Sequence, residues 1–363
     1  MQYFWIDWLR FLAAFLVVLS HARGAAFVEY GALLPEERGY LISIFYAITR
    51  LGHEAVIAFF VLSGFLVGGK LLIRVQKQSF CWRTYAVDRT TRIMLPLVPA
   101  IGFTLFASCL VSYPLSYFDV LGNLFSLQGV VVEPLKANRP LWSLAYEVWF
   151  YVLAGGAAAI FLGQGNLKYS GSLVLLSGAM FIFLSPVYLI CWCMGALAYL
   201  RLPQRWNPVA AFIACLIVFC GITLCQLTSN TRLEGNDWLS SLDFLNRSFA
   251  ELCLAIGVAL LVRSLCGVRE LKGNARSFEE IGARLAKSSY SLYLFHYPVI
   301  VIWAELGIKE HSGRLIDSPL LFILMISSSF FISFIFYYLF ERNTIRLRLR
   351  ILDNLSFKGN KKI

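Results

Sequence analysis

Charged residues are scarce in this 363-residue sequence: Asp, Glu, Lys and Arg make up 15% of it, while 59% of the residues are hydrophobic. A water-soluble domain of this length needs more charge to cover its surface, so a soluble fold is excluded. The sequence also lacks an internal repeat of roughly 20–50 residues, a low-complexity tract and a linker rich in glycine or serine. We therefore expect one membrane domain at residues 1–341, followed by a basic cytoplasmic tail at residues 342–363.

The hydrophobic residues cluster in runs long enough to cross a bilayer about 30 Å thick as helices. Because a helix satisfies its own backbone hydrogen bonds in lipid, hydropathy predicts an all-α bundle of about ten transmembrane helices. The boundary at Ser185-Pro186 is the least defined, and the apolar segment 40–52 is expected to be an interfacial or re-entrant helix. The expected spans are residues 4–22, 54–73, 93–112, 141–162, 170–185, 187–200, 208–226, 248–264, 289–307 and 318–340.

The net charge of +11 raises the possibility of nucleic-acid binding, but the charge follows the expected spans. When alternate loops are assigned to opposite sides of the membrane, 22 Lys and Arg residues lie on one side and nine on the other, with Arg10 inside the first span. The positive-inside rule then places both termini in the cytoplasm. We expect no nucleic-acid partner, although the basic inner loops could hold an anionic ligand.

Most of the nine cysteines lie within the expected spans, where they pack as small apolar residues, so disulfides are not expected. Cys191 and Cys193 form a C-x-C pair, but the sequence has no second pair of ligands at the spacing of a zinc site. We expect neither a metal site nor a tightly bound cofactor.

The first span contains three residues that an apolar helix rarely carries: Asp7, Arg10 and His21. Charges within a bilayer are costly, so they usually face the interior of the bundle and serve function. Arg10 and His21 return to within about 20° of one helix face, about 16 Å apart along the axis, and Asp7 lies near enough to pair with Arg10. Alternatively, Arg10 reaches the inner surface and His21 only ends the helix. The shared face favours a membrane-bound enzyme.

Glu147 lies about a turn and a half into the span at residues 141–162, with Ser143 and Tyr151 four residues to either side on its face. Because this span is expected to start outside, Glu147 is placed in the outer half of the membrane, at the depth of His21. A carboxylate there could orient the imidazole and raise its basicity, which predicts a general-base pair. Alternatively, the neighbouring hydroxyl groups merely stabilise Glu147.

Two further segments are candidates for ligand contact. The sequence FFVLSG at residues 59–64 places Ser63 and Gly64 near the middle of the second span, where small residues also allow close helix packing. Arg89 and Arg92 are separated by three positions at the inner membrane edge, so their planar guanidinium groups could bind phosphate. Lipid headgroups are the other usual partners of such basic residues.

The span at residues 289–307 carries a polar stripe made by Ser289, Tyr293 and His296. Pro298 has no N–H and so frees a backbone carbonyl one turn earlier. This span is expected to start inside, which places His296 in the inner half of the membrane, near the depth of Arg10. Alternatively, His296 is structural and is hydrogen-bonded to a tyrosine.

Together these segments resemble the acyltransferase family 3 membrane enzymes, which O-acylate cell-surface carbohydrates and related acceptors. Five patterns of that family occur in family order between Asp7 and Pro298. They are the arginine and histidine of the first span at Arg10 and His21, FFxxSG at residues 59–64, RxxR at residues 89–92, SLxxExxFY at residues 143–151 and SYxxYxxHxP at residues 289–298.

The resemblance implies a cytoplasmic acyl-coenzyme A donor, most often acetyl-CoA, and an acceptor hydroxyl group of a carbohydrate or lipid-linked glycan on the outer side. It also implies a multi-pass protein of the bacterial cytoplasmic (inner) membrane, in contact with membrane lipid. In this hypothesis Arg89 and Arg92 bind the donor phosphates and Arg10 supports the thioester. His21 is the general base or carries the acyl group covalently, and Glu147 orients His21.

The site hypothesis groups these residues by role. The catalytic residues are His21, Glu147, Arg10 and Asp7; the donor-binding residues are Arg89, Arg92, Ser63, Gly64 and His296; the supporting residues are Ser143, Tyr151, Ser289 and Tyr293. A proton-coupled transporter or flippase of small or lipid-linked sugars would also place such residues inside a bundle. The sequence shows no inverted repeat and no paired broken spans, which disfavours that alternative.

Overall fold

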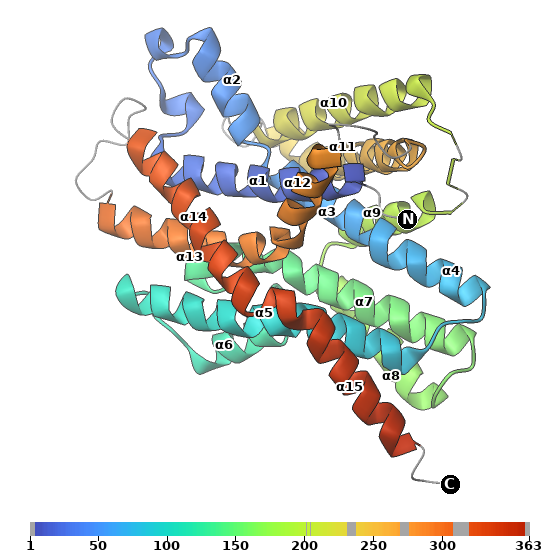
Figure 1. The fold of residues 1–363 in the computed structure, drawn as a ribbon. Helices are drawn as coiled ribbons and strands as arrows, with labels where there is room; N and C mark the ends of the chain where they lie inside the picture. Colours follow the sequence, from blue (N-terminus) through green and yellow to red (C-terminus); the bar gives the residue numbers. More distant parts are fainter. Residues whose placement is uncertain are drawn as a thin grey trace. The chain divides into compact units, whose positions relative to one another are not determined.

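The computed structural model describes residues 4–200, 202–203, 205–230, 237–268, 276–307 and 319–359, which form helices joined by turns and loops (Figure 1). Among these residues there is no strand, and the β-bridge between Gln128 and Val132 is isolated. The predicted all-α class is therefore confirmed. By its contacts the chain divides into two compact units.

The first unit comprises Met1–Ala13, Leu51–Ser79 and Leu184–Ala286. Within it α10 packs along α11, and α9 packs against α3, η3 and α11. Proline opens α9 and α10, a position where its missing N–H costs no helical hydrogen bond. The helices of this unit are the first part of α1 (Phe4–Ala26), α3 (Gly52–Ser63), the π-helical segment η3 (Gly64–Gly69), α4 (Lys70–Gln76), α9 (Pro186–Ala198), α10 (Pro208–Asn230), α11 (Asp237–Leu265) and α12 (Arg276–Lys287).

Two glycines let α9 touch the α3–η3 segment backbone to backbone. A Cβ atom at Gly64 would lie 1.9 Å from the carbonyl oxygen of Trp192, and one at Gly195 would lie 2.0 Å from that of Val61. The indole Nε1 of Trp192 also donates to the hydroxyl of Ser63 at 3.3 Å. Small residues at a helix crossing are how membrane helices gain close packing, because lipid provides no hydrophobic force between them.

The second unit comprises Ala14–Arg50, Phe80–Phe183 and Lys287–Ile363. Helix α13 packs against α5, α14 and η4, and α7 packs against α8. Its elements are the second part of α1, η1 (Tyr30–Ala32), η2 (Pro35–Glu37), α2 (Tyr40–Thr49), α5 (Trp82–Leu110), α6 (Tyr117–Leu124), η4 (Lys136–Leu141), α7 (Trp142–Phe161), α8 (Leu167–Phe183), α13 (Ser289–Gly307), α14 (Pro319–Leu339), η7 (Glu341–Asn343) and α15 (Thr344–Gly359).

The η4 segment enters the core of the second unit just before α7 begins. Asn138 of η4 is 0% exposed and donates from its amide to the hydroxyl of Thr104 and to the carbonyl of Leu294, at 3.0 Å each. The Leu294 carbonyl has no helical donor because Pro298 lacks an N–H, and Asn138 supplies one. The prediction that Pro298 frees a carbonyl is thus confirmed.

Seven helical segments of the described residues are long and apolar enough to cross a membrane, by length and composition. The other three predicted spans correspond to the shorter α8 and α9, which divide at the predicted Ser185-Pro186 boundary, and to α13. In the windows of α10 and α14, 17% of residues are buried, as expected for helices with most of their surface in lipid. The chain is an integral membrane protein; the number of ten spans and the cytoplasmic position of both termini stay predictions.

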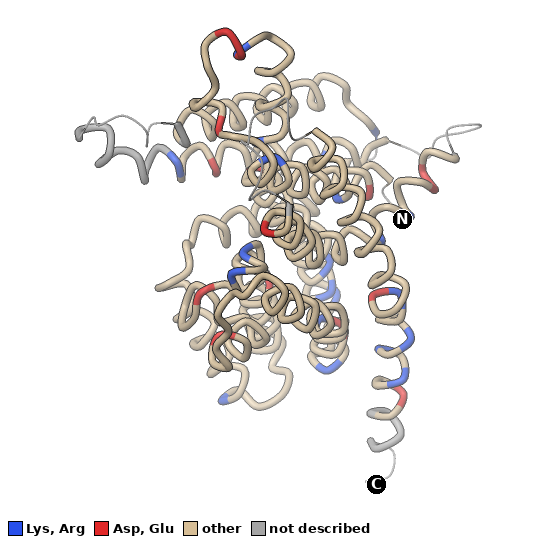
Figure 2. Tube along the Cα trace, turned by 90° about the vertical axis from the view of Figure 1, so that its left-hand side faces the viewer, with Lys and Arg blue, Asp and Glu red and all other residues tan. Residues whose placement is uncertain are grey.

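Helix α5 begins at Trp82, well before the predicted start at residue 93, so Arg89 and Arg92 belong to a helix rather than to a loop. The predicted basic tail forms α15, whose charged positions are mainly basic (Figure 2). It packs against α5, where a guanidinium nitrogen of Arg348 lies 3.2 Å from a carboxylate oxygen of Asp88.

Candidate active site

His21 lies beside two side chains of α13. Its ring centroid is 5.3 Å from that of His296 and 5.0 Å from that of Tyr297, which meets it edge-on. The placement of His296 near the depth of Arg10 is therefore wrong. Counting residues from the start of each span assumes that helices begin at the same depth, yet His21 near the end of α1 meets His296 in the first half of α13.

The hydrogen bonds of His296 define its tautomer. Nδ1 lies 2.8 Å from the carbonyl oxygen of Tyr293 and 3.1 Å from that of Leu292. A carbonyl only accepts, so Nδ1 carries the proton and Nε2 carries the lone pair. This Nε2 is buried and has no hydrogen-bond partner among the described residues. His296 thus offers a buried base next to His21.

Asp7 and Arg10 form the predicted ion pair in the first unit. A guanidinium nitrogen of Arg10 lies 3.9 Å from a carboxylate oxygen of Asp7, and each side chain is 19% exposed. The two residues are three positions apart on one helix, which brings their side chains together without tertiary help. Continuous α1 carries Arg10 in the first unit and His21 in the second.

Glu147 does not join His21. The described contacts of His21 are with His296 and Tyr297, whereas Glu147 accepts a short hydrogen bond from the hydroxyl of Tyr151 one turn further along α7. The expected general-base pair assumed that α7 starts at the outer surface. The start of α7 is instead held inside the core by η4. Glu147, one and a half turns later, therefore lies deeper than a count of residues from the outer surface suggests.

Arg89 forms the centre of a second cluster in the same unit. Its guanidinium makes a short ion pair with Asp88 and lies 5.4 Å from the ring centroid of Tyr151, in cation–π geometry. Tyr85 donates to the backbone carbonyl of Tyr151 at 3.0 Å and so fixes this part of α7 on α5. Arg92, three residues after Arg89, is exposed. Glu147 therefore lies with Arg89, on the side where donor phosphates are expected.

Polar side chains of α7 and α13 lead from one cluster to the other. The hydroxyl groups of Ser143 and Tyr293 lie 2.5 Å apart, and the rings of Tyr293 and His296 are 5.9 Å apart. Ser143 stands one turn before Glu147 on α7, and Ser289, 2% exposed, opens the polar stripe of α13. We call this series the polar track: Arg89, Tyr151, Glu147, Ser143, Tyr293, His296 and His21.

The structure places Ser63 and Gly64 in the packing contact with α9. Gly64 meets the backbone at Trp192, and Ser63 accepts from the Trp192 indole. Of the two interpretations left open for this motif, close helix packing accounts for both residues. Their role in donor binding stays a prediction.

The first unit contains a buried polar cluster that was not predicted from the sequence. His53 Nε2 of α3 lies 2.7 Å from a carboxylate oxygen of Glu251 of α11, which also accepts from Arg247 and Tyr188 at 3.3 Å each. Three polar side chains from three helices thus satisfy one carboxylate that is 4% exposed. The signal in the sequence is the adjacent pair His53-Glu54 at the start of a long apolar run.

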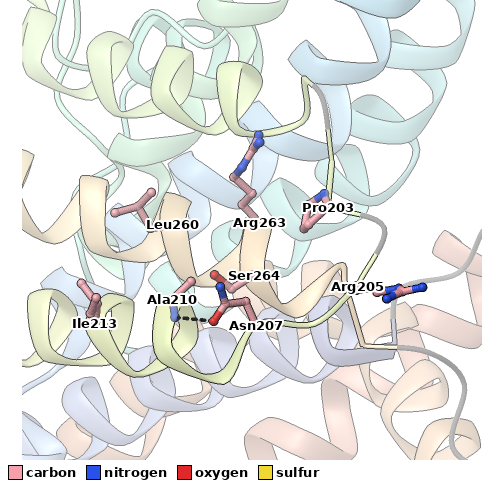
Figure 3. A pocket seen from close by; sticks show the side chains of 8 residues that line it. All are labelled: Pro203, Arg205, Asn207, Ala210, Ile213, Leu260, Arg263 and Ser264. Atoms are coloured by element: carbon pink, nitrogen blue, oxygen red, sulfur yellow. Dashed lines mark hydrogen bonds between the residues drawn. The ribbon is translucent and has the colours of Figure 1, made fainter.

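The first unit also contains a cavity of about 360 Å³ between α10 and α11 (Figure 3). Arg263 at its edge donates to the carbonyl of Leu200 at 2.5 Å and so caps the end of α9. Asn207 accepts from the N–H of Ala210 and begins α10. The cavity is lined by Pro203, Arg205, Asn207, Ala210, Ile213, Leu260, Arg263 and Ser264, which include none of the predicted site residues.

Within the described ranges, no three His, Cys, Asp or Glu side chains converge as metal ligands would.

Comparison with known proteins defines the class. The family described as "Acyltransferase domain" matches residues 3–338, so the chain belongs to this acyltransferase family. A relative from Bacillus subtilis (strain 168), named "Putative peptidoglycan O-acetyltransferase YrhL", is 23% identical over 69% of this chain and 44% of its own length. The chain thus spans less than half of that relative. No solved structure matches it. With its apolar helices, the protein is a membrane-embedded member of this acyltransferase family.

Proposed function

We propose that the chain moves an acyl group, in the first place acetyl, from cytoplasmic acyl-coenzyme A to a hydroxyl group of a surface polysaccharide or glycan precursor. The observation that carries this proposal is the polar track, with Arg89 at one end and the His21–His296 pair at the other. The name of the Bacillus relative supports acetyl as the group and a carbohydrate polymer as the acceptor. The distribution of Lys and Arg along the sequence supports a cytoplasmic donor end.

The Arg89 end of the polar track offers groups that can bind the phosphates of coenzyme A. The Nε atom of Arg89 is buried and has no hydrogen-bond partner in the part of the chain that the structure describes. A guanidinium fork held by Asp88 and the Tyr151 ring, with exposed Arg92 beside it, offers phosphate oxygens charge-assisted hydrogen bonds. Arg10, fixed by Asp7, is proposed to support the thioester.

Acyl transfer at the His21 end of the polar track requires one general base. The acceptor oxygen attacks the thioester carbonyl carbon, the ester C–O bond forms and the C–S bond breaks. The hydroxyl proton passes to His21 and then to the departing coenzyme A thiolate, so atoms and charge balance. The imidazole of His296, whose ring centroid lies 5.3 Å from that of His21, places a second basic group beside the proposed base. Covalent transfer through an acyl-imidazole of His21 is the other route that the same geometry allows.

Replacing Arg89 by alanine is expected to raise the KM for acetyl-CoA by about 10- to 100-fold, because a charge-assisted phosphate contact is lost. Asp88 keeps its contact with Arg348 at 3.2 Å, so the variant does not strand a carboxylate. Arg89→Lys keeps the charge but not the fork and should lie between wild type and alanine. Steady-state assays in membranes measure this, with exposed Arg83→Ala as the matched control. An unchanged KM for acetyl-CoA would refute the donor assignment.

The proposal as a whole is tested by mass spectrometry of surface glycans from cells with and without the gene. We expect ester-linked acetyl groups that disappear when the gene is deleted and return when it is restored, and we expect the protein in the inner-membrane fraction. The transporter alternative predicts instead that purified protein in liposomes moves sugars without any acyl donor. Glycans with unchanged acylation after deletion would contradict the proposed function.

A further inference from the structure

The side of α13 that runs from His21 toward the end of the helix carries groups that the catalytic proposal does not use. Tyr297, Val301 and Glu305 are spaced four residues apart and so follow one side of the helix. Tyr297 meets the His21 ring edge-on at 5.0 Å. This side of α13 therefore runs from the proposed base, His21, to the carboxylate of Glu305, two turns further along the helix.

A tyrosine from the loop after α5 completes this surface. The hydroxyl of Tyr113 donates to a carboxylate oxygen of Glu305 at 2.8 Å. This hydrogen bond, together with burial, raises the pKa of Tyr113, so the phenol keeps its proton and goes on donating. The second oxygen of Glu305 retains its capacity to accept hydrogen bonds from another donor.

The same surface passes from buried to exposed. His296 is fully buried, whereas His21, Tyr297, Tyr113 and Glu305 are partly exposed. Small apolar residues form its floor: the two tyrosines pack on a cluster of Ala107, Ala137 and Val301. The guanidinium of Arg139, exposed in η4, lies within electrostatic reach of both phenols. We call Tyr113, Arg139, Tyr297 and Glu305 the outer wall.

The outer wall has the chemistry of a carbohydrate site. A sugar hydroxyl group both donates and accepts, so it is matched by a carboxylate that accepts and by phenol and guanidinium groups that donate. Aromatic rings with polar ends give flat apolar contact for a sugar face. A hydrocarbon chain would offer no hydrogen bond to the second carboxylate oxygen of Glu305 or to the Arg139 guanidinium, and the Glu305 carboxylate would repel phosphates of a donor.

We propose that the outer wall is the acceptor subsite, which binds the sugar ring whose hydroxyl group is acylated and presents that hydroxyl group to His21. This inference rests on the proposed function and adds the residues that select the acceptor. Arg139 and Glu305 bind hydroxyl groups at the open end, and Tyr297 positions the sugar ring against the His21 imidazole. Tyr113 acts through Glu305 and is a positioning residue.

The test separates acceptor binding from catalysis. Membranes are assayed with labelled acetyl-CoA and with a cell-surface glycan fraction that alkali has freed of O-acetyl groups. We expect Glu305→Gln and Arg139→Gln to raise the KM for the glycan at least about tenfold, with kcat and the KM for acetyl-CoA within about threefold of wild type. Tyr113→Phe should raise the same KM less, because Glu305 remains. Slow hydrolysis of acetyl-CoA without glycan should not change.

Matched controls come from the same unit. Tyr30→Phe removes a phenol that contacts the Ser43 hydroxyl at 2.9 Å, and Glu37→Gln removes a carboxylate that accepts from the Leu34 N–H. Both should leave every parameter unchanged. The inference is overturned by variants at wild-type membrane levels whose KM for the glycan is unchanged, or whose kcat and both KM values change together as in a loss of folding. Wild-type membranes that transfer no acetyl group to the glycan overturn the proposed function, and this inference with it.

Discussion

Replacing His21 by alanine is expected to lower the rate of acyl transfer by about 10²- to 10⁴-fold, the usual contribution of a positioned general base. The acceptor hydroxyl is too weak a nucleophile without a group that takes its proton. His296 cannot substitute fully, because it is completely buried whereas His21 is partly exposed and borders the outer wall. The measurement is transfer of radiolabelled acetyl from acetyl-CoA to surface glycan in membranes that contain equal amounts of each variant.

The sequence offers a matched control for this variant. His311 lies outside the described residues and has no role in the proposal, so His311→Ala should transfer acetyl at the wild-type rate. His21→Gln keeps a hydrogen-bonding side chain but cannot accept a proton as imidazole does, and should be as inactive as alanine. Unchanged transfer by His21→Ala at wild-type membrane levels would remove His21 from the chemistry.

Adding a single methyl group at Gly64 or Gly195 is expected to destabilise the first unit by about 3 kcal/mol, at the upper end of the range for overpacking. The new Cβ atoms would lie 1.9 Å and 2.0 Å from carbonyl oxygens of the facing backbone, which cannot rotate away as a side chain can. The helices would have to separate, and the bond between Trp192 and Ser63 would be lost. Thermal unfolding of the detergent-solubilised protein, followed by size-exclusion chromatography, measures the effect.

Gly102→Ala is the control, because a Cβ atom at Gly102 of α5 meets no heavy atom within 4 Å. Alanine has the higher helix propensity by about 0.5–1 kcal/mol, so this variant should be as stable as wild type or slightly more stable. If Gly64→Ala and Gly102→Ala unfold at the same temperature, the close backbone contact does not contribute to stability.

Local features of the site could be predicted from the sequence, because they depend on helix spacing alone. Asp7 and Arg10 pair as expected, and Glu147 finds Tyr151 four residues away. The membrane class and most spans follow from apolar runs whose length the bilayer dictates. These properties require no knowledge of how one helix packs on another.

Tertiary features could not be read in this way. The depth of each side chain in the membrane was inferred from the number of residues after the expected start of its span. That inference fails where η4 enters the core before α7 and where α5 already starts at Trp82. It therefore separated His21 from His296, which lie together, and joined His21 to Glu147, which lies with Arg89 instead. The contact between His53 and Glu251 links residues about 200 positions apart, and a hydropathy pattern does not indicate such contacts.

The contacts of Asn138 also bear on how the second unit can move. Its amide bonds Thr104 of α5 and Leu294 of α13 at once, and it is itself part of η4. A fluctuation that parts any two of these three segments therefore has to break buried hydrogen bonds in water-poor surroundings, which makes it rare. The bond to Leu294 lies two residues from His296 along the chain. The imidazole of His296 is thus mounted on a segment that buried hydrogen bonds tie to both η4 and α5, so its position beside His21 is maintained as long as these bonds hold.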